Sequence, residues 1–110
     1  MVTYRVEHEH VIFSVGEDLT LDNIAHFVEV FEQAIEETRI YQVIIEAQNI
    51  PMADSSGIGA LVSQYKRLRD KGGSIVLVGA REGLLETLRV TALDKILMPR
   101  TDLEKALEQD

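Results

Sequence analysis

The chain contains no cysteine, so it can form no disulfide, thiol nucleophile or thiolate metal site. It also lacks an excess of basic residues. Eleven Lys and Arg stand against 19 Asp and Glu, and the net charge of −8 repels nucleic acid and anionic membrane surfaces. No apolar run approaches the roughly 20 residues of a membrane helix, and residues 1–10 show no signal-peptide pattern. These absences predict a cytoplasmic protein with no nucleic-acid partner and no membrane insertion.

The residues that are present are typical of a folded domain. Hydrophobic residues make up 45% of the chain and charged residues 27%, which is an ordinary globular balance. A length of 110 residues suits a single hydrophobic core. Because no repeat, linker or low-complexity segment divides the sequence, we expect residues 1–110 to form one domain.

The negative charge is unevenly distributed along the chain. Residues 1–53 carry ten acidic and two basic side chains, a net charge of −8, whereas residues 54–110 carry nine of each. Four of the acids, Glu29, Glu32, Glu36 and Glu37, share the polar side of an expected helix. Two interpretations remain open: a solvated helix face, or a docking face for a basic partner.

Hydrophobic periodicity predicts an α/β fold with the order β-β-α-β-α-β-α-β-α. The first two strands are expected to form a hairpin that turns at Glu9 and His10. Strands that alternate with helices indicate one mixed sheet of four to five strands, covered by about four helices. The expected strands span residues 4–8, 11–15, 41–45, 74–78 and 96–98.

Short polar side chains mark where the helices are expected to begin. Thr20 or Asp22 is placed to cap the first helix, since its side-chain oxygen can accept a hydrogen bond from an unpaired amide. Thr101 and Glu104 have the spacing of a capping box for the last helix.

The histidines and glycines do not match a metal or nucleotide site. His8 and His10 would share one face of a strand, but His26 is remote in sequence and no helical pair of ligands exists. Gly57-Ile58-Gly59 lacks the third glycine of a dinucleotide fingerprint, because Val62 occupies its position. We therefore expect no metal and no cofactor.

A serine hydrolase is the least favoured function. Ser55 or Ser56 would need a base, and His26 alone lies outside the N-terminal hairpin. The nucleophile elbow is also missing, since Ala53 and Asp54 precede Ser55. No catalytic residue is assigned.

The segment 52–59 is nevertheless unusual, because it places an acid, two hydroxyls and two glycines where a loop enters a helix. Asp54 or Ser55 is expected to be the N-cap of this helix. A helix N-terminus tolerates negative charge, so a phosphate on a serine here would add about −1.5 to −2 charges without unfolding the domain. Such a charge on an exposed surface can reverse a binding preference.

The segment Met52-Ala53-Asp54-Ser55-Ser56-Gly57-Ile58-Gly59-Ala60-Leu61 resembles the signature of bacterial anti-sigma-factor antagonists, the STAS-domain family. That signature is a hydrophobic residue, a variable one, and then Asp-Ser-Ser/Thr-Gly-Leu-Gly. Gly16-Glu17, Gly72-Gly73, the length and the order of elements also match. The resemblance implies a single STAS domain that is a transcription regulator and not an enzyme. It would bind an anti-sigma factor that is also a serine kinase, and so free a sigma factor.

The resemblance also implies roles for individual residues. Ser55, or as second choice Ser56, would be the phosphorylation site. Phosphorylation would end the binding, and a serine phosphatase would restore it. Asp54, Ser55, Ser56, Gly57 and Ile58 would contact the partner. The alternative role of Asp54 is to orient the hydroxyl, and that of Ser56 is to cap the helix.

The sequence departs from the family pattern at two places. Asp18 and Leu19 stand in reversed order after Gly16-Glu17, and Thr91-Ala92-Leu93 replaces a glycine before the last expected strand. The alternative function is a non-switching STAS scaffold, or an accessory subunit of a signalling or transport complex. The oligomeric state is open, with a monomer as the default.

Overall fold

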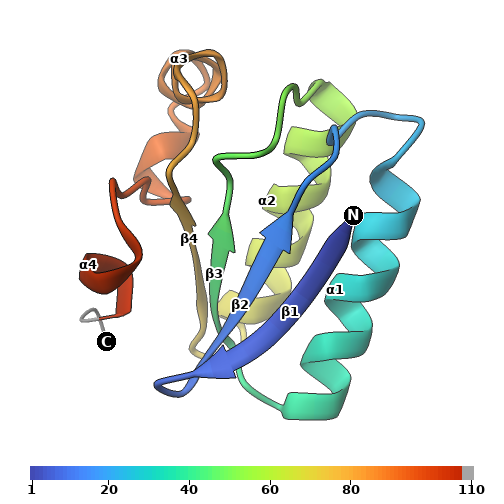
Figure 1. Cartoon of the computed structure of the whole chain (residues 1–110), viewed down its shortest axis with the longest axis vertical. Helices are drawn as coiled ribbons and strands as arrows, with labels where there is room; N and C mark the ends of the chain where they lie inside the picture. The colour runs from blue at the N-terminus through green and yellow to red at the C-terminus, as the bar shows by residue number, and fades with distance from the viewer. Residues whose placement is uncertain (108–110) are drawn as a thin grey trace.

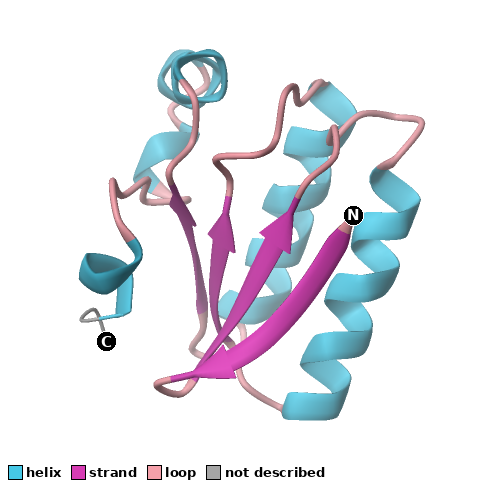
Figure 2. Cartoon of the chain, viewed as in Figure 1, coloured by secondary structure: helices cyan, strands magenta, loops and turns pink. Residues whose placement is uncertain are grey.

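The computed structural model describes residues 1–107 and contains a four-stranded mixed sheet (Figures 1 and 2). The last three residues of the expected domain, 108–110, lie outside the described residues. The strands follow the order β1-β2-β3-β4; β1 and β2 are antiparallel, and the other pairs are parallel. This confirms the predicted fold class. The strands are β1 (Val2–Glu7), β2 (His10–Val15), β3 (Gln42–Glu46) and β4 (Ser74–Val78).

The helices cover both faces of the sheet unequally. Two long helices, α1 (Ile24–Thr38) and α2 (Ser55–Arg69), lie side by side on one face, and the short α4 (Leu103–Leu107) packs against the other face near β4 (Figure 1). The helix α3 (Glu82–Val90), followed by a 3-10 turn at Leu93–Lys95, lies beyond the carboxyl end of β4.

Alternating side chains of β2 explain why the sheet is buried on both faces. Phe13 points toward α1 and stacks on Phe31, with ring centroids 4.8 Å apart. Its neighbour Ile12 points to the opposite face and packs beneath α4. Because successive residues of a strand face opposite sides, a strand covered on both faces is apolar throughout.

The hairpin between β1 and β2 is confirmed, but its turn is one residue earlier than predicted. His8 and Glu9 form the turn, with positive φ values of 50° and 63°. These values match the two-residue turns that follow the twist of paired strands. His10 is therefore a residue of β2, paired with Glu7, and its Nδ1 lies 2.7 Å from the carbonyl oxygen of His8.

The predicted caps of the first helix are wrong. The N-cap of α1 is Asn23, which makes no side-chain capping bond, and neither Thr20 nor Asp22 begins the helix. Instead, the Thr20 carbonyl accepts from the amides of Asn23 and Ile24 at 2.9 and 2.8 Å. This turn takes up the residues that the sequence pattern assigned to the start of the helix.

The predicted strand at 96–98 is also wrong. Leu97 is fully buried in the core, and the chain pairs with β4 through a single-residue bridge between Arg100 and Val78. The Arg100 amide donates to Leu77 at 2.8 Å, and its carbonyl accepts from Gly79 at 3.0 Å.

The capping box predicted for the last helix is replaced by a simpler cap. Asp102 lies immediately before α4, and its carboxylate accepts a hydrogen bond at 2.9 Å from the amide of Lys105, which lies within α4. Asp102 therefore provides the bond that the spacing of Thr101 and Glu104 had suggested.

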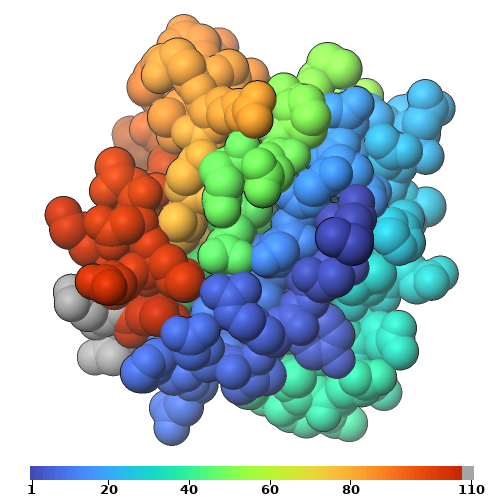
Figure 3. All heavy atoms as spheres, in the orientation of Figure 1, coloured from blue at the N-terminus to red at the C-terminus, as the bar shows by residue number. Residues whose placement is uncertain are grey.

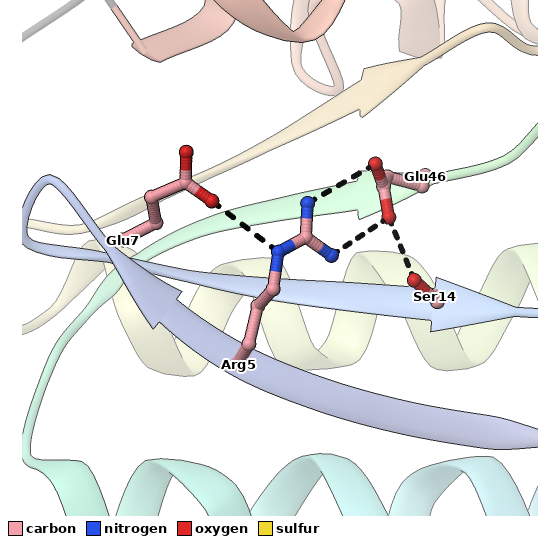
Figure 4. Close-up of polar contacts among 4 residues, drawn as sticks. All are labelled: Arg5, Glu7, Ser14 and Glu46. Atoms are coloured by element: carbon pink, nitrogen blue, oxygen red, sulfur yellow. Dashed lines mark hydrogen bonds and ion pairs between the residues drawn. The ribbon is translucent and has the colours of Figure 1, made fainter.

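A polar cluster ties three strands together on the face that α4 leaves open (Figure 4). The Arg5 guanidinium of β1 donates to Glu46 of β3 at 3.1 and 3.4 Å, and Ser14 of β2 donates to the same carboxylate at 2.6 Å. Arg5 first, and then Ser14, lower the pKa of Glu46. The Glu46 side chain is only 17% exposed, so these partners replace much of its water.

This cluster makes stability depend on pH. Because the pKa of Glu46 is lower in the folded chain than the unfolded value of about 4.3, its ionised form stabilises the fold above that pH. The contribution disappears as pH falls through the folded-state pKa. We expect Glu46→Gln to lower the melting temperature at pH 7, and the gap from the parent to narrow as pH falls toward 3. A gap that stays constant with pH would contradict the assigned role of the charge.

Candidate functional site

The predicted site residues lie at the first turn of α2, at the carboxyl ends of the parallel strands (Figure 1). Ser55 is the first residue of the helix and is exposed, whereas Asp54 and Ser56 are half-buried. Gly57 and Ile58 are buried. The five residues are thus adjacent, but Ser55 is the one among them whose side chain stands open to solvent.

Asp54 is the N-cap of α2, as the sequence predicted. Its Oδ1 accepts from the amides of Ser56 at 2.9 Å and Gly57 at 3.1 Å. Its Oδ2 accepts from the amide of Leu21, at 3.1 Å, in the loop between β2 and α1. The Gly57 amide first, then those of Leu21 and Ser56, lower the pKa of Asp54. The carboxylate therefore fixes both a helix and a second loop, and Ser56 is not the helix cap.

Leu19 joins the β2–α1 loop to the β3–α2 loop. Its amide donates to Met52 at 2.9 Å, and its carbonyl accepts from Asp54 at 3.1 Å. The Leu19 side chain is fully buried in the core. The reversed order of Asp18 and Leu19 thus places the apolar residue inward, and the two loops form one connected surface.

Two glycines of the motif have different roles. A Cβ added to Gly57 would lie 1.9 Å from the Leu19 carbonyl oxygen, so only glycine permits this approach of the two loops. A Cβ added to Gly59 would meet nothing within 4 Å. Gly57 is therefore required by packing, whereas no contact within the described chain requires Gly59.

Two large apolar side chains are exposed beside Ser55. Leu21 on the β2–α1 loop is 72% exposed, and Met52 on the β3–α2 loop is 57% exposed. Solvated apolar side chains that flank a polar residue are typical of a protein-binding surface. Sequence reasoning did not single out Leu21, because an apolar residue before an amphipathic helix gives no signal of its own exposure.

The acidic face of α1 is partly used by contacts within the domain. Glu32 pairs with Arg67 and accepts from Gln64 at 2.9 Å, which links α1 to α2. Glu37, in the last turn of α1, accepts from the Tyr4 hydroxyl at 2.6 Å. These acids lie away from Ser55, since α1 runs from the site toward the opposite end of the molecule (Figure 1).

The geometry does not assemble a serine hydrolase. His26 faces Glu17, with Nδ1 3.4 Å from Oε1, and among residues 1–107 no hydrogen bond joins a histidine to Ser55 or Ser56. Within the same described range, no group of three side chains is placed to hold a metal ion. None of the helices in this range is long and apolar enough to cross a membrane.

Comparison with known families identifies the domain. The model of the STAS domain matches residues 1–107, so the chain belongs to the STAS family. A relative from Thermotoga maritima, named as a candidate anti-sigma factor antagonist, is 26% identical over 112 residues, covering 99% of this chain and 96% of its own. The anti-sigma F factor antagonist of Paenibacillus polymyxa is 29% identical over 73 residues, covering 66% and 62%. The family is non-enzymatic, in agreement with the sequence-based expectation.

Solved structures confirm the fold. The crystal structure of the Thermotoga maritima protein superposes with a TM-score of 0.90 at 21% identity, covering 97% of this chain and 92% of that one. The phosphorylated form of the Bacillus protein SpoIIAA superposes with a TM-score of 0.74 at 18% identity, covering 98% and 97%. At these identities the similarity establishes the architecture alone.

Proposed function

We propose that this chain is an anti-sigma factor antagonist, switched off by phosphorylation of Ser55. It binds an anti-sigma factor that is also a serine kinase and thereby frees a sigma factor. The observation that carries this proposal is that Ser55 is exposed at the start of α2, while Leu21 and Met52 on the two adjoining loops are exposed as well. The names of its relatives support the same class of function.

The surroundings of Ser55 explain how one phosphate can end the binding. The helix N-terminus favours the added charge, so the domain stays folded. In the complex, Ser55 would be covered by the partner together with the two apolar side chains. A group of about −1.5 to −2 charges would then lose its water inside that interface, which opposes association. Its bulk would also clash with the partner, and a serine phosphatase would reverse the change.

The proposal is tested by pairwise binding measurements. Each anti-sigma factor kinase of the source organism is purified, immobilised and exposed to this chain in biolayer interferometry, with and without ATP. We expect one kinase to bind, and to release its sigma factor as the chain is added. Binding to none of these kinases would contradict the proposal.

Substitution of Gly59 by alanine is expected to have opposite effects on the stability of the domain and on partner binding. Glycine inside a helix costs roughly 1 kcal/mol relative to alanine, and the structure leaves open space for a Cβ at this position. We expect Gly59→Ala to stabilise the domain by about that amount while weakening the partner complex, because the added methyl group occupies the exposed face of α2. Thermal melts and the same binding assay provide both readouts. A stabilised variant with parental affinity would show that the partner does not approach this face.

A further inference from the structure

An unfilled cleft lies next to the exposed surface around Ser55. The residues that line it belong to the β3–α2 loop and α3, and its volume is about 230 Å³. These two segments lie at the same end of the sheet as the start of α2 (Figure 1). Pockets for small molecules usually measure about 300–1,000 Å³. The cleft is therefore too small for a typical cofactor and suits a single side chain. Its lining comprises Ile50, Pro51, Met52, Ala53, Arg81, Gly83, Leu84 and Thr87.

The lining mixes apolar and polar groups and carries one charged residue. Ile50 and Leu84 are buried, and Met52 connects the cleft to the apolar surface beside Ser55. Arg81 is the one charged residue among the lining residues that the structure describes. Its Nε donates to the Gln48 carbonyl at 2.9 Å, which holds the guanidinium at this position.

Gly83 leaves one wall of the cleft open. A Cβ at this position in α3 would meet nothing within 4 Å, so packing does not require a glycine there. In the space-filling view, the atoms of α3 and of the β3–α2 loop lie next to each other at one end of the molecule (Figure 3). A side chain entering between them would be enclosed on two sides.

We propose that this cleft receives an apolar side chain of the partner protein, with a carboxylate beside it that pairs with Arg81. The inference rests on the proposed function and specifies the chemistry of its partner. On the other side of Ser55, the β2–α1 loop carries Asp18 and Asp22, which favour basic groups. The partner therefore presents basic groups toward that loop, and an apolar and acidic segment toward α3. Because the two sides of the surface carry opposite charges, they fix the orientation of the partner.

Methyl NMR of the full chain tests the position of the contact directly. The chain has three methionines, and Met98, packed beneath α4, is an internal control for Met52. The purified kinase that binds the chain in the biolayer interferometry assay is added to protein labelled at the methionine methyl groups. We expect the Met52 signal to shift or broaden strongly, and the Met98 signal to remain unchanged.

Variants test the cleft itself. Gly83→Leu fills its open wall and Arg81→Glu reverses its charge, and we expect each to weaken binding at least tenfold, about 1.4 kcal/mol. Gly83→Ala fills little of the cleft and is the matched control. Val90→Ser removes a 76%-exposed side chain of α3 outside the cleft and is a second control. Both controls should bind like the parent, and thermal melts verify that every variant folds.

Two results would overturn the inference in different ways. If Ser55→Asp weakens the complex while Gly83→Leu and Arg81→Glu bind like the parent, the cleft is not part of the interface and the proposed function stands. If no anti-sigma factor binds the parent, the proposed function and the cleft both fail.

Discussion

Gly57→Ala is expected to destabilise the domain by about 3 kcal/mol, at the upper end of what overpacking usually costs. The added Cβ would lie 1.9 Å from the carbonyl oxygen of Leu19 and 2.9 Å from its Cβ. The backbone of the β2–α1 loop would have to move away, and the bonds that join it to Met52 and Asp54 would weaken. Denaturant unfolding followed by circular dichroism measures this loss.

Gly59→Ala is the matched control for Gly57→Ala, because it adds the same methyl group two residues later in the same helix. That variant should be more stable than the parent, so the two substitutions should move the unfolding midpoint in opposite directions. Equal midpoints for the two variants would show that the contact between Leu19 and the first turn of α2 is not as close as the structure has it.

Ser55→Asp is expected to weaken the complex with the anti-sigma factor at least about 100-fold. An uncompensated charge buried at an interface typically costs about 3–5 kcal/mol, and 2.7 kcal/mol already corresponds to a factor of 100. Ser56→Ala should change the affinity far less, because Ser56 is half-buried inside the first turn of α2. Isothermal titration calorimetry with the purified kinase gives both affinities.

Ser55→Ala separates the effect of charge from the loss of the hydroxyl. We expect it to bind like the parent, because the structure gives no hydrogen bond from the Ser55 hydroxyl to another described residue. Parental affinity of Ser55→Asp would count against the switch.

Most of the fold could be predicted from the periodicity of apolar residues, because the buried positions of each strand and helix are the ones that apolar residues occupy. The β4 strand at Ser74–Val78 has the predicted bounds, and the opening hairpin is confirmed with its turn one residue earlier. The prediction of a strand at 96–98 failed because an apolar run before Pro99 also suits an irregular segment that buries Leu97 in the core. Local pattern does not distinguish these outcomes, since it contains no information about hydrogen-bond partners.

The site was predictable where its chemistry is local. The cap at Asp54 follows from the residues beside it, because a short carboxylate before a helix accepts the first amides. Its bond to Leu21, and the contact that requires Gly57, join segments more than 30 residues apart. The cleft depends in the same way on α3, which follows the motif by about 25 residues. Such contacts depend on the tertiary fold, and no spacing in the sequence reveals them.

Phosphate transfer from the partner kinase tests whether Ser55 is the residue that switches binding. The purified kinase is incubated with this chain and labelled ATP, and the modified residue is mapped by mass spectrometry. We expect about one phosphate per chain, located on Ser55 and absent from Ser55→Ala, and a phosphorylated product that no longer binds the kinase. Equal labelling of Ser55→Ala, transfer to Ser56 instead, or undiminished binding of the phosphorylated chain would contradict this expectation.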